Sequence, residues 1–233
     1  MRQHRRVTVL SLLTSCVLAV SGLSPSQAST RKTYFCFGQP ATIVGSADGD
    51  PIRGTKGNDV IVGLGGGDLI NGLGGDDLIC EGAGPDYIDG GPGNDQISGG
   101  TGPDQLLGVS GRDRLLGGAD NDWIKPGPGR DTLVGGPGED LVDYNDQPGD
   151  TQCSVDVDLS TGIGRGPCFG TDHLTSIEDI DGSGGADHLV GDAGANLITD
   201  EGGAGDQVFG MGGDDSLQGH SDGDSADGGP GRR

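Results

Sequence analysis

The chain has 233 residues, of which 51 are glycine and 3% are aromatic, and its formal net charge is −22. Glycine loses the most backbone freedom on folding, and few large side chains offset that loss, so an ordinary globular core is not expected. The acidic charge repels nucleic acid and anionic membrane surfaces, and it favours a cation as the binding partner.

Residues 1–28 are predicted to be a secretory signal sequence. Three arginines precede a mostly apolar run that is too short for a comfortable membrane span, and small residues place the cleavage after Ala28. We therefore expect a secreted, extracellular protein. An alternative is a lipoprotein anchored through Cys16. No other stretch is apolar enough to span a membrane, so membrane insertion is not expected.

Residues 29–44 are predicted to form an N-terminal cap. In the nine-residue phase of the segment that follows, Ile43 falls at the position of a core residue, whereas Ala41 stands where an aspartate is expected. Solenoids need such modified repeats at their ends. The segment is too short to hold a catalytic domain.

Residues 45–143 divide into eleven nonapeptides without a gap. Position eight is Ile, Leu or Val in every unit, and position four is glycine except at Asp48 and Asp120. The composition alone is also typical of disorder, but a disordered linker does not hold two positions at fixed phase over eleven periods. Position six is aspartate throughout: Asp50, Asp59, Asp68, Asp77, Asp86, Asp95, Asp104, Asp113, Asp122, Asp131 and Asp140.

Each unit is predicted to form a glycine-rich turn at positions one to six and a short strand at positions seven to nine. Because side chains alternate across a strand, the aliphatic residue at position eight points inward, and positions seven and nine face solvent. If two nonapeptides make one coil, units of the same parity stack and their aspartates form two columns. The spacing allows this arrangement but does not require it.

The aspartates and the glycine-rich turns predict calcium binding. Calcium takes six to eight hard oxygen ligands and accepts backbone carbonyls beside carboxylates. A turn rich in glycine can aim several carbonyls inward, and two turns stacked at strand spacing can share an ion. We therefore expect several Ca²⁺ ions with the position-six aspartates as metal ligands, and no catalytic residue or other cofactor.

Residues 144–181 interrupt the period. The segment 154–159 alternates apolar and polar residues and is predicted to be a strand. Cys153 and Cys168 bracket this strand and the turn after it, so we expect a β-hairpin that lies against the array.

Residues 182–233 are predicted to be a second, degenerate array with a C-terminal cap. Asn196 takes position six in its second unit, and one extra residue near Asp200 shifts the frame. The array decays towards its end, where Arg233 stands at the aspartate position. The metal ligands predicted in this array are Asp187, Asp206, Asp215 and Asp224.

The repeat resembles the calcium-binding nonapeptide of the RTX (haemolysin-type) family, and 90–98, Gly-Gly-Pro-Gly-Asn-Asp-Gln-Ile-Ser, fits it at every fixed position. The resemblance covers 45–143 closely and 182–227 more loosely. It implies an all-β fold, a parallel β-roll (β-solenoid), with ions held between consecutive turns by the motif aspartate and turn carbonyls. Many family members leave the cell through a C-terminal signal, whereas this chain has an N-terminal one, which favours general secretion followed by folding outside.

The inward side chains make a thin core. One aliphatic residue in each repeat contributes far less free energy than is lost in ordering nine backbone residues, and stacked carboxylates repel one another. We therefore expect the array to be largely unfolded without calcium and to fold when the ion binds.

Four cysteines remain after removal of the signal, which indicates two disulfide bonds in a secreted chain. Of the three possible pairings we favour Cys36–Cys80 and Cys153–Cys168. Cys80 is at position nine and points outward, where the N-terminal lead can fold back over it. A zinc site is the alternative, but the usual Cys-x-x-Cys spacing is absent.

The favoured function is a secreted, non-enzymatic calcium-binding protein with a structural or adhesive role and an unknown extracellular partner. An ice-binding sheet would need a regular outward rank of Thr or Asn, which positions seven and nine lack. The Gly-x-Ser-x-Gly match around Ser221 lies in a repeat turn without the strand–turn–helix context of a nucleophile elbow. The main alternative is a small secreted hydrolase whose active site in 144–181 uses Asp156, Asp158, Asp172, Glu178 and Asp179.

Overall fold

The computed structural model describes residues 32–145, 153–219 and 223–230, and the 23 regular elements in these residues are all β-strands. They belong to one compact unit that begins at Thr33. In this part of the chain no helix is long and apolar enough to cross a membrane. The predicted signal sequence, Cys16 and Ser221 lie outside the described residues.

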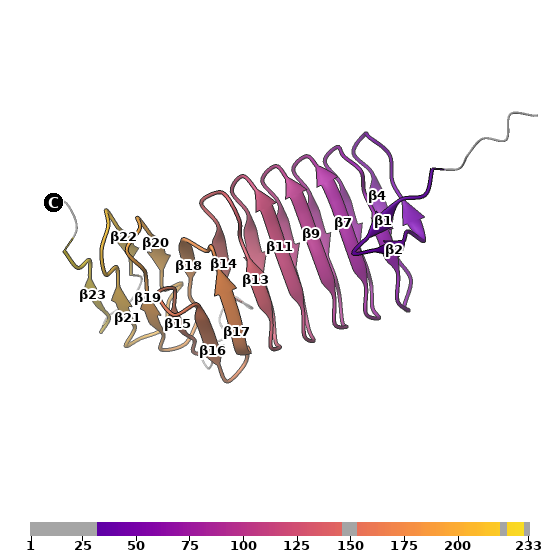
Figure 1. Ribbon diagram of the computed structural model, residues 1–233. Coiled ribbons are helices and arrows are strands. Elements are labelled where there is room, and N and C mark those ends of the chain that lie inside the picture. The colour runs from indigo at the N-terminus through magenta and orange to yellow at the C-terminus, as the bar shows by residue number, and fades with distance from the viewer. Residues whose placement is uncertain (1–31, 146–152, 220–222, 231–233) are drawn as a thin grey trace, which may run out of the picture. The chain divides into compact units, whose positions relative to one another are not determined.

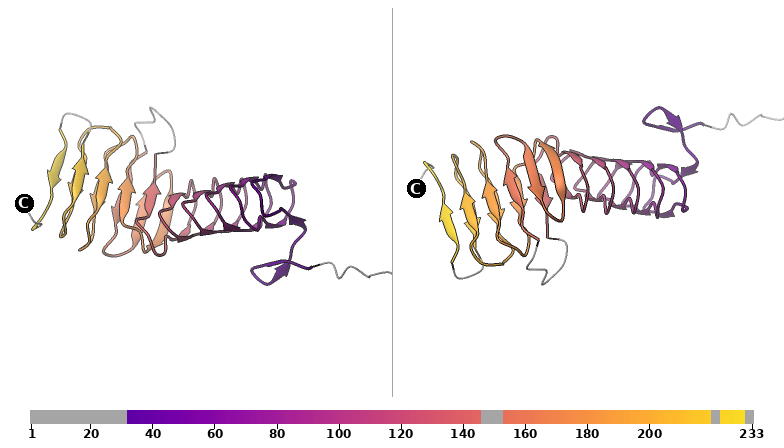
Figure 2. Two further views of the ribbon diagram at one scale, coloured as in Figure 1. Left: turned by 90° about the horizontal axis from the view of Figure 1, so that it is seen from above. Right: turned by 90° about the horizontal axis from the view of Figure 1, so that it is seen from below.

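The strands form a parallel β-roll, which confirms the predicted fold class (Figure 1). In 45–143 the chain alternates between two opposite sheets that are joined by turns (Figure 2). Neighbouring strands of one sheet are 18 residues apart, since Ile52 pairs with Ile70 and Ile61 pairs with Ile79. Two nonapeptides therefore make one coil.

The nine-stranded sheet takes every second nonapeptide, and all its neighbouring strands are parallel. Its strands are, in spatial order, β4 (Pro51–Arg53), β6 (Leu69–Asn71), β8 (Tyr87–Asp89), β10 (Gln105–Leu107), β12 (Trp123–Lys125), β14 (Leu141–Asp143), β18 (Asp179–Asp181), β20 (Leu197–Thr199) and β22 (Ser216–Gln218).

The twelve-stranded sheet takes the other nonapeptides and two additional strands. Its strands are, in spatial order, β3 (Ile43–Val44), β5 (Val60–Val62), β7 (Leu78–Ala83), β9 (Gln96–Thr101), β11 (Arg114–Ala119), β13 (Thr132–Val134), β17 (Gly170–Thr175), β16 (Ile163–Gly166), β15 (Asp156–Asp158), β19 (His188–Val190), β21 (Gln207–Phe209) and β23 (Ser225–Asp227).

The core is a double row of the aliphatic residues at position eight. Ile52 is 7% exposed, and the position-eight residues from Ile61 to Val142 are fully buried. Position seven faces outward, as Leu69 at 56% exposure shows. The alternation predicted from the strand period is therefore present, and the interior holds about one large side chain for each nonapeptide.

The insertion contains the predicted hairpin, but the hairpin does not lie against the array. Its strands β15 and β16 are antiparallel to each other and lie in line within the twelve-stranded sheet, between β17 and β19. The nine-stranded sheet has no counterpart to them, because β18 pairs directly with β20. Larger side chains fill the core here: the rings of Tyr144 and Phe169 pack edge to face with centroids 5.2 Å apart.

The N-terminal lead contains a short hairpin that the sequence did not indicate, β1 (Phe35–Cys36) with β2 (Gln39–Pro40). Ile43 then pairs in parallel with Ile61 and packs against the core, at the position that its phase predicted.

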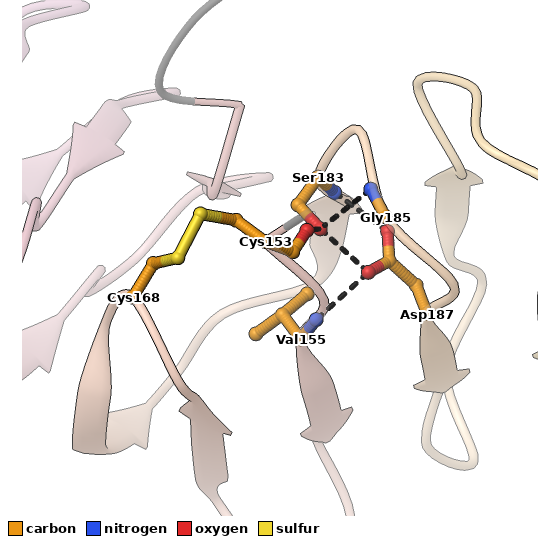
Figure 3. The surroundings of a disulfide bond; sticks show 6 residues. All are labelled: Cys153, Val155, Cys168, Ser183, Gly185 and Asp187. Carbon is orange, nitrogen blue, oxygen red and sulfur yellow. Dashed lines mark hydrogen bonds between the residues drawn. A yellow bond between two sulfur atoms is a disulfide. The ribbon is translucent and has the colours of Figure 1, made fainter. Parts of the chain in front are cut away.

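Both predicted disulfide bonds are present, Cys36–Cys80 and Cys153–Cys168. The first ties the N-terminal hairpin to β7. The second ties the segment before β15 to the turn between β16 and β17, and beside it the Ser183 hydroxyl contacts the Cys153 carbonyl oxygen (Figure 3).

We expect the double substitution Cys36→Ala/Cys80→Ala to lower the free energy of unfolding by about 3–4 kcal/mol. The bond spans 44 residues, and removing it restores the conformational freedom of that loop in the unfolded chain. Urea denaturation in saturating calcium, followed by circular dichroism, measures the change. A loss below about 1 kcal/mol would show that the unfolded chain gains little freedom from opening this loop.

Candidate metal sites

The position-six aspartates stack in two columns along the edges of the roll, linked by hydrogen bonds between coils. The backbone N–H of Asp59 donates to Oδ1 of Asp77, and the N–H of Asp77 donates to Oδ1 of Asp95, both at 2.8 Å. The same bond recurs at 2.7–2.9 Å along 50–140 in both columns. This bond holds each carboxylate through its Oδ1 atom and thereby fixes the direction in which Oδ2 points.

The second carboxylate oxygen, Oδ2, is buried without a hydrogen-bond partner in most units. A buried carboxylate oxygen without a partner is costly, because its hydration is lost and nothing replaces it. A regular row of such oxygens indicates cation-binding sites. Within the described residues this atom is without a partner in Asp68, Asp77, Asp86, Asp95, Asp104, Asp113, Asp122, Asp131, Asp140, Asp206 and Asp215.

In most turns a glycine at position one leaves room beside this oxygen. A Cβ added to Gly90 would lie 2.6 Å from Oδ2 of Asp95, and one added to Gly108 would lie 2.6 Å from Oδ2 of Asp113. Both distances are shorter than real Cβ contacts, so a side chain would intrude on the oxygen. The glycines thus keep a small space lined by carboxylate and carbonyl oxygens.

Burial raises the pKa of several of these carboxyl groups in the ion-free chain. It raises the pKa of Asp95 to about 7 and that of Asp113 to about 8, against an ordinary value of 3.8. The backbone N–H donated from the preceding coil opposes the shift, and neighbouring carboxylates add to it. At neutral pH the ion-free columns are therefore partly protonated, and a bound cation would replace those protons.

At the start of each array the second oxygen is satisfied by the turn itself. The backbone N–H of the residue at position two donates to Oδ2 from Ser46 to Asp50 at 2.7 Å, and from Thr55 to Asp59 at 2.6 Å. The same bond joins Ser183 to Asp187 at 2.6 Å. The sequence predicted fifteen equivalent aspartates. The structure distinguishes those whose Oδ2 atom lacks a partner from those whose Oδ2 atom already accepts a backbone N–H of its own turn.

Two further positions in the columns of the second array differ from the simple pattern. Asn196 takes position six, and its amide donates to the Glu178 carbonyl oxygen at 2.6 Å, so a neutral group joins two turns directly. Asp224 accepts from the backbone N–H groups of Gly205 and Asp206, at 3.0 and 3.1 Å, with the same oxygen.

Two carboxylates of the insertion continue the columns and were not predicted as ligands. Asp172 accepts the N–H of Asp131 at 2.8 Å, and Glu178 accepts the N–H of Asp140 at 3.0 Å. The sequence signal was present: each is followed two residues later by a buried aliphatic residue, the spacing of positions six and eight.

Two groups of three carboxylates were also missed by the sequence reasoning. In each group one oxygen from every member lies within 4.8 Å of the others. Glu81 joins Asp68 and Asp86 in the first group, and it stands at position one, where glycine is usual. The second group consists of Asp200, Asp206 and Asp224. Asp200 is the extra residue of the second array, and the other two are at position six.

The remaining carboxylates of the hydrolase hypothesis make contacts within the roll. Asp156 accepts from Arg165 at 2.7 Å and contacts the His188 ring at 3.0 Å on the outer face. Asp158 accepts from Ser160 at 2.6 Å, and Asp179 accepts the N–H of Leu197 at 2.7 Å. The five residues of that hypothesis are thus distributed between the columns and the outer face instead of meeting at one site.

The oxygen set fits calcium. The ligands that the turns can offer are carboxylates and backbone carbonyls, the hard donors that Ca²⁺ prefers, and there is no cysteine or histidine in the columns. One carboxylate oxygen from each of two stacked turns, with carbonyls from both, would share an ion. When bound, the ion would neutralise charge and cross-link consecutive coils.

A family model for the RTX calcium-binding nonapeptide repeat matches residues 44–79, 82–106, 107–143, 181–206 and 201–232. Together these matches cover more than half of the chain. A comparison with curated proteins found no match.

Proposed function

Because the chain belongs to the RTX calcium-binding nonapeptide repeat family, we propose that it is a secreted protein whose array folds when Ca²⁺ binds between stacked turns. The observation that carries this proposal is the row of buried Oδ2 atoms without partners. Their number and regular spacing follow from the repeat, and a cation between coils gives each of them a partner at once.

We propose that the ligands are the position-six aspartates whose Oδ2 lacks a partner, with turn carbonyls completing the shell. Asp50, Asp59 and Asp187 would act mainly as members of the hydrogen-bonded column, because their second oxygen already accepts a backbone N–H. Several ions are bound in each column on this proposal, and none is needed for chemistry on a substrate.

We propose a structural or adhesive role outside the cell. Two disulfide bonds fit an oxidising, extracellular compartment. The RTX β-roll is a structural calcium-binding fold, and the strongly acidic chain is suited to a cation-rich exterior. The predicted signal sequence, 1–28, supports export by the general secretory route. On this proposal the partner is an extracellular molecule, and not nucleic acid.

Substitution of two adjacent aspartates in one turn tests which carboxylates are calcium ligands. Asp77 is at position six and fully buried, whereas Asp76 is at position five and exposed, where it accepts from Asn94. Asp77→Asn keeps the Oδ1 acceptor and removes the charged second oxygen. We expect about one calcium ion fewer per chain, or about a tenfold weaker site, measured by calorimetric titration.

Asp76→Asn is the matched control, because it removes the same charge from the same turn. We expect it to leave the amount of bound calcium unchanged and the affinity within about twofold. Equal losses in the two variants would mean that calcium responds to the overall charge and not to the columns, and the proposed ligand set would be wrong.

A further inference from the structure

Glu81 breaks the repeat at a position where almost every other turn has glycine. In 45–143 position one is glycine except at Glu81 and Pro126. A glutamate here must carry its side chain beside the carboxylate of a stacked turn. It does so while remaining 1% exposed, and its backbone carbonyl accepts the N–H of Leu64 from the coil before at 2.7 Å.

The Glu81 carboxylate lies between two stacked position-six aspartates. One oxygen of Glu81, one of Asp68 and one of Asp86 all lie within 4.8 Å of one another. Both Glu81 oxygens are buried without a hydrogen-bond partner, as are the Oδ2 atoms of the two aspartates. A side chain on Gly63 would collide with Glu81 Oε2 and Asp68 Oδ2, so the glycine of the facing turn makes the space.

We propose that Glu81 supplies a third carboxylate to the calcium site between turns 63–68 and 81–86, and that this gap binds Ca²⁺ more tightly than the other gaps of the array. The inference rests on the proposed function. The number of charged ligands is a principal determinant of calcium affinity, and the other gaps of the first array have two column carboxylates each. The glutamate also adds up to two oxygens to the coordination shell.

This site lies beside the Cys36–Cys80 disulfide bond, where it could start the folding of the array. Glu81 follows Cys80, which the disulfide bond ties to the N-terminal hairpin. The coil that contains Glu81 is already cross-linked by the disulfide bond. If its site binds Ca²⁺ at a lower concentration than its neighbours do, this pair of turns would become ordered first. The next gaps in both directions would then form on an existing template.

The test is a calcium titration of the full, disulfide-bonded chain against a chromophoric chelator that reports the tightest site. Glu81→Gln removes the charge, and Glu81→Gly restores the residue that the motif has at position one. We expect both variants to weaken the tightest site about tenfold or more and to leave the remaining sites unchanged. Glu139→Gln removes an equal charge from an exposed position in another turn and is expected to stay within twofold.

Each outcome decides the inference. If Glu81→Gln and Glu81→Gly both bind like the unsubstituted chain, the inference is wrong and the proposed function stands. Tighter binding in Glu81→Gly would mean that the glutamate occupies the place of the ion, and would also overturn it. If the unsubstituted chain binds no calcium, the proposed function itself fails. Should Glu81→Gln not fold, Glu81→Gly still decides, since glycine is the residue of the neighbouring repeats.

Discussion

Removal of calcium is expected to unfold most of the array. In the described residues eleven buried aspartate oxygens lack a partner, and the core contains about one large side chain per nonapeptide. The burial of one aliphatic side chain contributes roughly 1.5–3 kcal/mol, whereas ordering each backbone residue costs about 1–2 kcal/mol. Without the ions, repulsion between ionised carboxylates stacked within each column adds to that deficit. Far-UV circular dichroism of the full chain in a chelator should show little β-structure, and millimolar Ca²⁺ should restore it.

Magnesium is the control for this experiment. Mg²⁺ has the same charge, but it demands a tight octahedral shell and gives up water reluctantly, so the same concentration should restore little structure. The disulfide bonds are kept oxidised throughout, so that only the ion changes. A structured spectrum that is unaffected by the chelator would show that the columns do not need a cation to fold.

Acid is expected to replace calcium in part, so that the ion-free chain is more stable near pH 5 than near pH 8. Burial raises the pKa of Asp104, Asp122 and Asp131 to about 7 each and that of Asp113 to about 8. The ordinary pKa of an aspartate is 3.8. Between these values the folded chain binds more protons than the unfolded chain. Stability is therefore present at low pH and is lost as the pH rises from about 4 to about 8.

Far-UV circular dichroism in a chelator at a series of pH values measures the folded fraction, and urea denaturation at the acidic values where the chain is folded measures its stability. The calcium-saturated chain is the control and should show the opposite trend, because protons compete with the ion and weaken its binding below about pH 6. Calorimetry near pH 6 in two buffers of different ionisation enthalpy should also detect protons released on calcium binding. Stability that rises with pH in the chelator would contradict the pKa shifts.

The nine-residue period predicted a stack of turns and short strands in one register, because position eight is aliphatic throughout. The resemblance to the RTX repeat implied the parallel β-roll. The pairing of Ile61 with Ile79 shows that two nonapeptides make one coil, which the spacing allowed but did not require. The disulfide pairing could also be predicted, because Cys80 at an outward position faces the N-terminal lead. These features depend on local pattern and spacing.

The path of the insertion could not be predicted, because it depends on long-range pairing. The alternation in 154–159 is the same whether the hairpin packs on the array or extends its sheet. Asp172 and Glu178 lack the glycine-rich turn that marks the other column members, so only their spacing from Leu174 and Ile180 indicated their place.

The division of the aspartates into two kinds has a local origin that is visible only with the structure. Ser46 and Thr55 stand at position two, and their hydroxyls bond within their own turns, to the Asp48 carbonyl oxygen and the Gly57 N–H. Such hydroxyls favour a closed turn, which brings the backbone N–H onto the turn's own aspartate. Leu64 has φ of +90° at the equivalent position, and there the N–H bonds instead to the next coil.

The in-line hairpin sets a limit on how far order spreads along the chain. In a solenoid each coil is coupled only to its nearest neighbours. Between the coil of β17 and β18 and that of β19 and β20, one sheet continues directly while the other is spaced by β15 and β16. Coupling across this boundary comes from strand pairs in both sheets, β18 with β20 on one side and β17, β16, β15 and β19 in succession on the other, and the Cys153–Cys168 disulfide bond adds a covalent link. A melting front that starts at either end is expected to slow there, because the stacking of identical turns is interrupted.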